Sequence, residues 1–329
     1  MTPKQRLYAG IEGRSCDRSP CTPIFMAWAA HFIGKTYRDY YLDGQVLADA
    51  QIAVAEAFGT DQVSAISDPW REASAYGMSF DWPAEGVGVP HARLLNEPRD
   101  VSKLRRWDPM DAPRTRQRVE SVATMAERVG STHSVLGWVE GPMAEYADLR
   151  GVEEAMLDLF DVPEAFHRAC EVIVPNAIAF AEAQVRAGAD MIGVGDAAAS
   201  LVGPELFTEH VLPWQQRLFE GIHAAGARVK LHICGNIGRI VEHLPTTGAD
   251  LIDLDWMVPV DEARRTVGPD VALAGNFDPA TILLRGSPDD VAAAARKCLA
   301  QGGSRFVLQP GCEVPPGTPE ENLRAFCPR

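Results

Sequence analysis

The chain has 329 residues, 46% of them hydrophobic and 23% charged, which is ample material for a large globular core. Its formal net charge of -14 argues against general binding to nucleic acids or anionic membranes, because both need a basic surface. The first residues lack an apolar stretch of signal-peptide length, and no later stretch reaches the roughly 20 apolar residues of a membrane-spanning helix. We therefore expect a cytoplasmic protein.

Short β-branched or apolar runs alternate along the chain with longer Ala-, Leu- and Glu-rich stretches of helical period. This pattern predicts strands at 22–29, 62–67, 134–140, 191–196, 228–234, 251–256, 271–277 and 305–309. Eight strands separated by helices favour an α/β fold of the (β/α)8 TIM-barrel type over an open doubly wound sheet.

No flexible linker or sequence repeat divides the chain, so we expect one domain over residues 1–329. The segment 76–114, between the second and third expected strands, is rich in Pro and Gly and lacks a clear period. Such an insertion could cover the barrel mouth as a lid or form a partner surface, although a passive loop is the simpler interpretation. The seven scattered cysteines favour reduced thiols over disulfides in a chain of this size.

Acids and soft metal ligands are concentrated at the expected carboxyl ends of the strands, where a barrel of this type places its chemistry. These residues are Asp68, Glu140, Asp196, His232, Cys234, Asp255, Asn276 and Cys312. Their carboxylates, from Asp68, Glu140, Asp196 and Asp255, are the candidate catalytic groups. Glu140, Asp196, Asp255 and Glu313 are also candidates for a fourth metal ligand or for orienting His232.

His232 and Cys234 at one strand end, with Cys312 at another, offer an imidazole and two thiolates. Zinc prefers these ligands, and a three-ligand set leaves the fourth position open for a substrate. The competing interpretation is that alternate strand residues simply pack inside the barrel. Cys312 follows Pro310-Gly311 at the last strand, and a closed barrel can bring that end near His232, so the pattern predicts a metal site.

Five segments in the right order, 137–146, 196–214, 231–236, 275–279 and 310–326, resemble the uroporphyrinogen decarboxylase superfamily. Decarboxylases of this superfamily carry two carboxylate-gripping arginines at the positions aligned with Trp28 and Phe32, and a histidine where this chain has Cys312. Asp68 does align with their catalytic aspartate. The zinc-dependent methyltransferase branch, which takes methyl groups from corrinoid proteins, resembles this chain at His232, Cys234 and Cys312.

The resemblance to that branch implies a zinc ion at these three residues and an acceptor that displaces the methyl group of a methyl-corrinoid. A thiol bound to zinc is deprotonated at neutral pH and stays nucleophilic. The chain has no Asp-x-His-x-x-Gly match of the kind that cobalamin-carrying domains use, so the corrinoid is expected on a partner protein docked over the barrel mouth. The acceptor implied is a thiol such as coenzyme M, or tetrahydrofolate.

Asn276, Trp28 and Trp256 are weaker candidates for lining the cofactor pocket, since turn formation and core packing explain them equally well. A sulfonate acceptor would need a cation near the mouth, for which Lys230, Arg239 and Arg71 are the candidates. Two other functions stay open. One is a metal-free decarboxylase acting on another acid, and the other is a non-catalytic module that binds a corrinoid protein and uses zinc only to tie two strands together.

Overall fold

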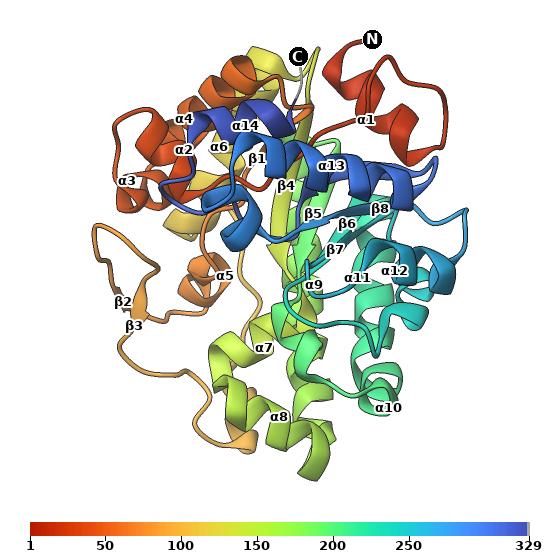
Figure 1. Ribbon diagram of the computed structural model, residues 1–329. Helices are drawn as coiled ribbons and strands as arrows, with labels where there is room; N and C mark the ends of the chain where they lie inside the picture. The colour runs from red at the N-terminus through yellow and green to blue at the C-terminus, as the bar shows by residue number, and fades with distance from the viewer. Residues whose placement is uncertain (328–329) are drawn as a thin grey trace.

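A computed structural model describes residues 1–327 of the chain. Its centre is a parallel sheet of seven strands in the order β1-β4-β5-β6-β7-β8-β9 (Figure 1). The strands are β1 (Gln62–Ser64), β4 (Ser134–Glu140), β5 (Met191–Gly195), β6 (Arg228–Ile233), β7 (Leu251–Leu254), β8 (Leu273–Phe277) and β9 (Phe306–Pro310). Nearly every strand residue is buried, as expected for a parallel sheet covered on both faces. The predicted TIM-barrel type of α/β fold is confirmed.

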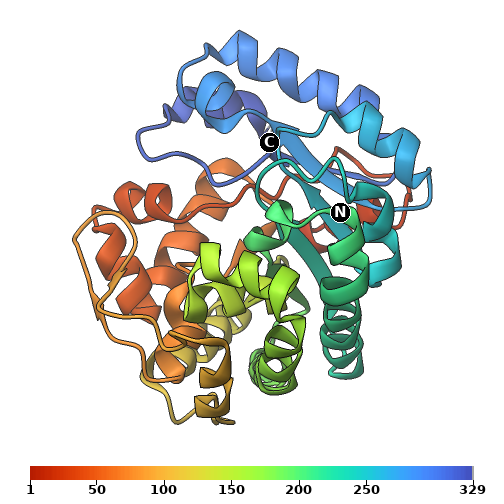
Figure 2. The same ribbon diagram turned by 90° about the horizontal axis from the view of Figure 1, so that it is seen from below.

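Helices surround the sheet, and 3-10 or π turns connect several of them (Figure 2). The α-helices are α1 (Pro3–Ile11), α2 (Ala27–Phe32), α3 (Tyr37–Leu42), α4 (Gly44–Phe58), α5 (Trp70–Ala75), α6 (Pro113–Val129), α7 (Pro142–Arg150), α8 (Val152–Asp161), α9 (Pro163–Arg186), α10 (Pro204–Leu206), α11 (Leu212–Ala224), α12 (Val260–Val267), α13 (Pro288–Gly302) and α14 (Glu320–Phe326). The other turns are η1 (Pro98–Lys103), η2 (Ala197–Leu201), η3 (Phe207–Val211), η4 (Val241–Thr247) and η5 (Pro279–Leu284).

The first predicted strand, at 22–29, is wrong. Cys21 forms only a single parallel bridge with Leu308 of β9. The Thr22 amide donates to the Leu308 carbonyl at 3.1 Å, and the Asp61 amide donates to the Cys21 carbonyl at 2.9 Å. Residues 20–22 therefore lie between β9 and β1 and close the barrel with one bridge where a full strand was expected.

The chain leaves the sheet after this bridge because its next groups have other partners. Pro23 has no amide hydrogen to give to a strand ladder. The Phe25 carbonyl accepts hydrogen bonds from the Tyr40 hydroxyl at 3.3 Å and from Gln51 Nε2 at 2.8 Å. Side chains of α3 and α4 thus satisfy the backbone that a strand would have paired, and α2 begins at Ala27.

Ordinary capping chemistry sets the bounds of the longer helices. Asp43 caps α4 by accepting hydrogen bonds from the amides of Gln45 and Val46, and Gly59 ends this helix in the left-handed conformation with φ of 68°. Asp278 likewise caps η5, since its carboxylate accepts from the amides of Ala280 and Thr281.

The insertion 76–114 lies outside the barrel, beside α5 (Figure 1). It contains a short antiparallel hairpin of β2 (Phe80–Asp81) and β3 (Val89–Pro90), followed by η1. The Phe80 ring lies 5.1 Å from the ring of Trp70, and the Trp70 indole nitrogen donates to the Gly88 carbonyl at 2.8 Å. The hairpin is therefore anchored on the helix that follows β1. A lid function for this segment stays a prediction.

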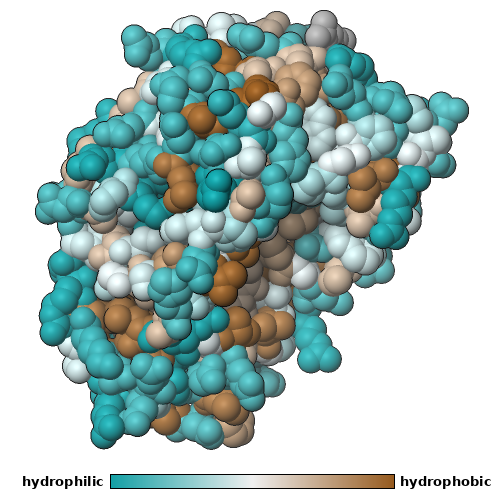
Figure 3. Space-filling model, turned by 90° about the vertical axis from the view of Figure 1, so that its left-hand side faces the viewer, coloured by the Kyte–Doolittle hydropathy of each residue, from teal (hydrophilic) through white to brown (hydrophobic). Residues whose placement is uncertain are grey.

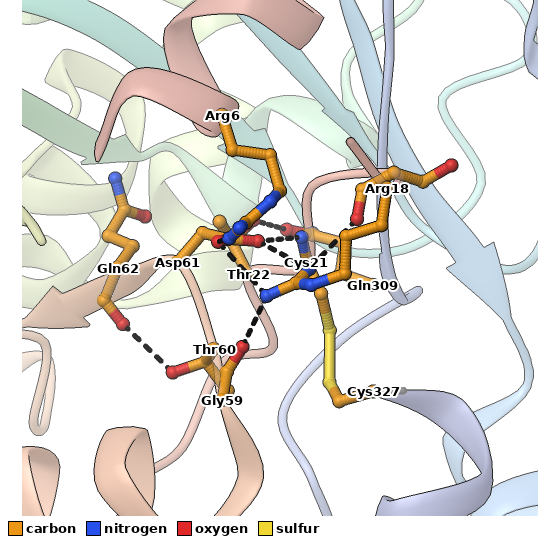
Figure 4. The surroundings of a disulfide bond; sticks show 11 residues. Arg6, Arg18, Cys21, Thr22, Gly59, Thr60, Asp61, Gln62, Gln309 and Cys327 are labelled. Carbon is orange, nitrogen blue, oxygen red and sulfur yellow. Dashed lines mark hydrogen bonds and ion pairs between the residues drawn. A yellow bond between two sulfur atoms is a disulfide. The ribbon is translucent and has the colours of Figure 1, made fainter. Parts of the chain in front are cut away.

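A disulfide joins Cys21 to Cys327, next to the last residue of α14 (Figure 4). The prediction of reduced thiols is therefore wrong for this pair, because folding brings together two cysteines that are 306 residues apart. The other cysteines are free thiols. Beside the disulfide the buried Asp61 carboxylate accepts hydrogen bonds from Arg6 at 2.5 Å and from Arg18 at 2.9 Å.

Among residues 1–327, no helix is both long and apolar enough to cross a membrane.

Candidate active site

The three predicted metal ligands come together at the carboxyl ends of β6 and β9. Nε2 of His232 lies 3.0 Å from Sγ of Cys234, and the two sulfur atoms of Cys234 and Cys312 are 3.8 Å apart. The third side of this triangle, from Cys312 Sγ to His232 Nε2, measures 4.0 Å. Tetrahedral zinc with Zn–S bonds of about 2.3 Å requires a sulfur-to-sulfur separation of about 3.8 Å, so the spacing of the two sulfur atoms suits this ion.

The backbone explains why these side chains converge. His232 is the last but one residue of β6 and Cys234 follows the strand, so both stand at the barrel mouth. Cys312 is two residues beyond β9. A Cβ atom at Gly311 would lie 2.2 Å from the amide nitrogen of Trp256, so only glycine lets this turn pack against the segment after β7. Glycine at position 311, directly before Cys312, is therefore required by the close packing of this turn against Trp256.

His232, Cys234 and Cys312, here called the metal-ligand cluster, differ in the direction in which their surroundings shift the pKa of each side chain. Burial lowers the pKa of the His232 imidazole, but Cys234 and Asp253 outweigh this effect and raise that pKa well above its ordinary value. The hydrogen bond from Cys234 lowers the pKa of Cys312 to about 4 despite burial, while the same contact raises the pKa of Cys234. Of the two thiols, Cys312 therefore loses its proton more readily than Cys234.

Asp253 is a site residue that the sequence interpretation missed. Its Oδ2 lies 3.0 Å from Nδ1 of His232 and 3.4 Å from Nζ of Lys230, and Gln309 donates to its Oδ1. Burial raises the pKa of Asp253, but Lys230 and His232 together hold it below its ordinary value. An anionic Asp253 keeps His232 Nδ1 protonated and leaves Nε2 free for a metal.

A cavity of about 150 Å³ opens beside the metal-ligand cluster. Its lining is mainly apolar, with a few acids and the three ligands. The lining residues are Ile24, Met26, Ile66, Ser67, Asp68, Pro69, Trp138, Glu140, Gly195, Ala197, His232, Cys234, Cys312 and Glu313. Trp138 forms one wall because Gly193 and Gly195 on β5 leave room for its ring; a Cβ at Gly193 would lie 2.2 Å from that ring.

Two of the predicted catalytic carboxylates line this cavity. Asp68 is held by Arg114, whose Nη1 and Nη2 donate to its two oxygens at 2.9 and 2.6 Å. Burial raises the pKa of Asp68, but the Arg114 charge outweighs it and lowers the pKa overall, so Asp68 is an anion fixed in an ion pair. Burial and Glu72 raise the pKa of Glu140 well above its usual range, and Trp138 Nε1 donates to it at 3.2 Å.

Glu313 also lines the cavity and accepts a hydrogen bond from the Ala27 amide at 3.1 Å. Burial raises the pKa of this carboxyl to about 7. It was predicted as a candidate fourth ligand, yet in the described part of the chain the group of three or more donors that lie within 4.8 Å of one another contains only His232, Cys234 and Cys312. The cluster therefore offers three protein donors.

The other two predicted carboxylates, Asp196 and Asp255, lie outside the cavity lining, and both accept hydrogen bonds from backbone amides. Asp196 accepts from the Ala144 amide and from Gln215 Nε2, each at 2.7 Å, and so ties β5 to α7 and α11. Asp255 accepts from the Gly235 amide at 2.9 Å and from the Met257 amide at 3.0 Å. Their contacts give both residues a structural explanation, and neither orients His232.

The predicted cofactor-lining residues are also outside the cavity. Asn276 is buried and donates to backbone carbonyls of Asp255 and Val258, which indicates a role in fixing the turn after β7. Trp28 stacks on Phe32 with ring centroids 5.3 Å apart and belongs to the core. Trp256 is 43% exposed at the mouth, so it faces solvent rather than the cavity.

None of the candidate sulfonate partners lines the cavity. Lys230 is buried within the barrel and donates to Gln309 Oε1 at 2.8 Å. Arg71 is fully buried, with its donors used by Ser67 and by backbone carbonyls. Arg239 lines a separate hollow with Leu201 and its neighbours.

Comparisons with known proteins agree with this architecture. Residues 2–328 match the uroporphyrinogen decarboxylase (URO-D) family. The chain therefore belongs to that family, which confirms the predicted superfamily. Its sequence is 27% identical to the methylcobamide:CoM methyltransferase MtbA of Methanosarcina acetivorans, over 98% of this chain and 96% of that protein. It is also 26% identical to the uroporphyrinogen decarboxylase of Rhodococcus opacus, over 99% of this chain and 95% of that protein.

A solved structure described as a methyltransferase from Methanosarcina mazei has the same fold, with a TM-score of 0.90 over 99% of this chain and 97% of that chain. The two are 23% identical in sequence, so this likeness concerns the fold. The relatives at about 27% identity thus include corrinoid-dependent methyltransferases, while decarboxylases of the same family lie at nearly equal distance. The choice between the two activities depends on the site.

Proposed function

We propose that this protein is a zinc-dependent methyltransferase that moves a methyl group from a methyl-corrinoid protein to a small acceptor, in the first instance a thiol. The observation that carries the proposal is the cluster of His232, Cys234 and Cys312, three soft donors with separations of 3.0 to 4.0 Å beside an apolar cavity. Zinc held there would supply a Lewis acid that binds a thiol as its thiolate. Structural zinc sites use four protein ligands. A site with three protein ligands therefore favours a catalytic zinc over one that only links two strands.

The residues of the chain divide the remaining tasks. Cys234 and Cys312 hold the ion, and Asp253 fixes the tautomer of His232 that presents Nε2. Trp138, Ile24 and Met26 exclude water from the acceptor. In the reaction the acceptor sulfur forms a bond to the methyl carbon while the cobalt–carbon bond breaks. The electron pair of that bond stays on cobalt, which leaves as cobalt(I), and the thiol proton passes to solvent.

The corrinoid protein is expected at the barrel mouth, where several large apolar side chains are exposed. Leu201 follows β5 and is 61% exposed, and Trp256 and Met257 follow β7 with 43% and 46% exposed. On α8, which lies at the same lower end of Figure 1, Phe160 is 77% exposed. Exposed large apolar side chains of this kind are typical of a protein interaction surface. Figure 3 shows further apolar residues beside a hollow on the side that carries α3 and the β2–β3 hairpin.

A metal-free decarboxylase is the second candidate, because Asp68 lines the cavity and decarboxylases are among the relatives. The contacts of Asp68 argue against it. Arg114 occupies both carboxylate oxygens, and no Lys or Arg is among the described residues that line the cavity. A substrate with several carboxylates would therefore find no free cation there.

Metal analysis together with a methyl-transfer assay tests the proposal. We expect about one zinc per chain, lost with activity in His232→Ala, Cys234→Ala and Cys312→Ala, with methylcobalamin as donor and thiols or tetrahydrofolate as acceptors. Cys16→Ala is the matched control, since Cys16 is a free, partly exposed thiol outside the cavity. Full methyl-transfer activity in metal-free protein would reject the zinc site, and a protein with neither zinc nor methyl-transfer activity would favour the decarboxylase function.

A further inference from the structure

The two halves of the metal-ligand cluster come from strands that are not neighbours in the sheet. His232 is on β6 and Cys234 follows that strand, whereas Cys312 follows β9. In the sheet that residues 1–327 form, β7 and β8 lie between β6 and β9, so backbone hydrogen bonds do not join these two strands directly. The separation of the three ligand atoms therefore depends also on side chains that cross the barrel interior.

Gln309 makes such a crossing. It is the last but one residue of β9 and is fully buried. Its Nε2 donates a hydrogen bond to Oδ1 of Asp253 on β7, and its Oε1 accepts one from Nζ of Lys230 on β6 at 2.8 Å. Thr22 Oγ1, in the segment 20–22 that closes the barrel, donates to the same oxygen at 3.1 Å. One amide therefore connects three strands and the closing segment.

The hydrogen bonds of Gln309 lead to the metal ligand on β6. Asp253 is paired in register with His232, and its Oδ2 lies 3.0 Å from Nδ1 of that imidazole. Lys230 precedes His232 by two residues and so lies on the same face of β6. Gln309 thus engages Asp253 through the carboxylate oxygen that does not face His232. Cys312 lies only three residues beyond Gln309 in the chain.

An amide suits this place better than any charged side chain. It offers a donor and an acceptor at once, whereas a carboxylate only accepts and an ammonium group only donates. Gln309 can therefore donate to Asp253 with one atom and accept from Lys230 with the other. Within residues 1–327, Gln309 is the one hydrogen-bond donor to Asp253 Oδ1. Loss of the amide would leave this carboxylate oxygen buried without a partner.

A purely structural role is the competing interpretation, because buried polar groups need partners wherever they lie. Gln51 on α4 is an example of such a role. It is also buried, and its Nε2 donates to the Phe25 carbonyl at 2.8 Å while its Oε1 accepts from the Ser64 amide at 3.1 Å. Both glutamines should therefore support stability, but only the hydrogen bonds of Gln309 end on a residue that contacts a metal ligand.

We propose, on the basis of the proposed zinc site, that Gln309 is a positioning residue for the metal. It holds Asp253 in place behind His232, and it keeps β9, and with it Cys312, at the separation from β6 that one ion requires. Gln309 itself touches neither the ion nor the substrate. Its loss should leave all three ligands present but less well placed, which weakens metal binding.

Gln309→Met tests this inference, because methionine has nearly the same length and volume but lacks the amide donor and acceptor. Zinc affinity is measured by competition with a chelator. The absorption spectrum of the protein loaded with Co²⁺ reports the geometry of the ligands. We expect zinc to bind at least about tenfold more weakly, as is common when a group that orients a metal ligand is lost, and the cobalt bands to shift. Neither readout depends on methyl transfer.

Two further variants separate positioning from stability. Gln51→Met is the matched control, which should lower stability in urea unfolding and leave zinc affinity and the cobalt spectrum unchanged. Thr22→Val keeps the shape of the side chain and removes one donor to Gln309 Oε1. It should weaken zinc binding less than Gln309→Met does, and it decides the question if Gln309→Met does not fold.

The outcomes distinguish this inference from the function on which it rests. If Gln309→Met loses stability as Gln51→Met does but keeps the zinc affinity and cobalt spectrum of the parent, Gln309 is only structural and the inference is overturned. Unchanged zinc affinity in Thr22→Val overturns it when Gln309→Met does not fold. A parent protein that binds neither ion would reject the zinc site and the inference together. Metal binding that depends on Gln309 without methyl transfer would reject the methyltransferase alone.

Discussion

Asp253 and His232 are partners in strand register: their Cα atoms pair between β7 and β6, and Asp253 Oδ2 lies 3.0 Å from His232 Nδ1. A contact of this kind fixes the ring orientation of a metal-binding histidine, and its loss commonly weakens metal binding by about 10- to 100-fold. We expect Asp253→Asn to retain the fold and to bind zinc that much more weakly, as measured by competition with a chelator. Asp261→Asn, on the surface of α12, is the control. Unchanged affinity in Asp253→Asn would show that the contact does not support the metal.

The ion pair of Asp68 with Arg114 provides a second test. Arg114→Met leaves a buried carboxylate without its partner, and such a change commonly destabilises a protein by about 3–5 kcal/mol. Urea unfolding should show this loss, and adding Asp68→Asn should recover much of it. If the single variant is as stable as the parent, the pair contributes nothing to the fold.

The same pair predicts a pH dependence. Arg114 outweighs burial and lowers the pKa of Asp68 in the folded protein, so the unfolded chain takes up a proton first as the pH falls. The stability from this pair is fully present above the ordinary pKa of about 4 and decreases below it. Unfolding curves at several pH values should show a weaker acid dependence in Asp68→Asn than in the parent.

Asp196 should behave in the opposite way. Burial raises its pKa to about 6 in the folded protein, so folding favours its protonated form between the ordinary pKa of about 4 and that value. The contribution of Asp196 to stability therefore falls as the pH rises through this interval, by up to about 3 kcal/mol, and is constant above it. Asp196→Asn should gain stability relative to the parent as the pH rises through the same interval, as measured by urea unfolding. A difference that does not vary with pH would contradict the raised pKa.

Gly193 makes space for the wall of the cavity. A methyl group at this position would lie 2.2 Å from the Trp138 ring, so Gly193→Ala must displace that ring or the strand, at a cost of about 1–3 kcal/mol. We expect a lower Tm, an altered tryptophan emission spectrum and reduced thiol binding. Gly203→Ala is the control, because its Cβ would meet no atom within 4 Å and its φ is -69°. Normal thiol binding in Gly193→Ala would mean that Trp138 does not shape the site.

The alternation of apolar runs and helical stretches predicted the barrel because strands β4 and β5 are buried along their whole length. This pattern failed at 22–29, where the apolar composition is typical of a strand. The side chains of Tyr40 and Gln51 there donate hydrogen bonds to the Phe25 carbonyl in place of a neighbouring strand. Apolar composition alone does not tell where backbone groups find their partners. Those partners are distant in the sequence and are set by tertiary packing.

The convergence of His232, Cys234 and Cys312 could be predicted because the spacing of His232 and Cys234 and the Pro-Gly turn before Cys312 are local signals. Asp253 was missed because its importance depends on the register between β6 and β7, which the sequence does not display. Its signal was one acid inside the apolar run Leu-Ile-Asp-Leu. Asp196 shared the strand-end position of the residues that line the cavity, yet the amide of Ala144 and the side chain of Gln215 occupy its oxygens.

The bond between Cys21 and Cys327 makes one covalent ring of almost the entire barrel. A protease that cuts once within an exposed loop, such as the 76–114 insertion, would open this ring without releasing either piece. The two fragments would separate on a denaturing gel only after reduction, and the nicked protein would keep its termini together at the seam between β9 and β1. Oxidised protein should therefore tolerate a single cut that reduced protein does not.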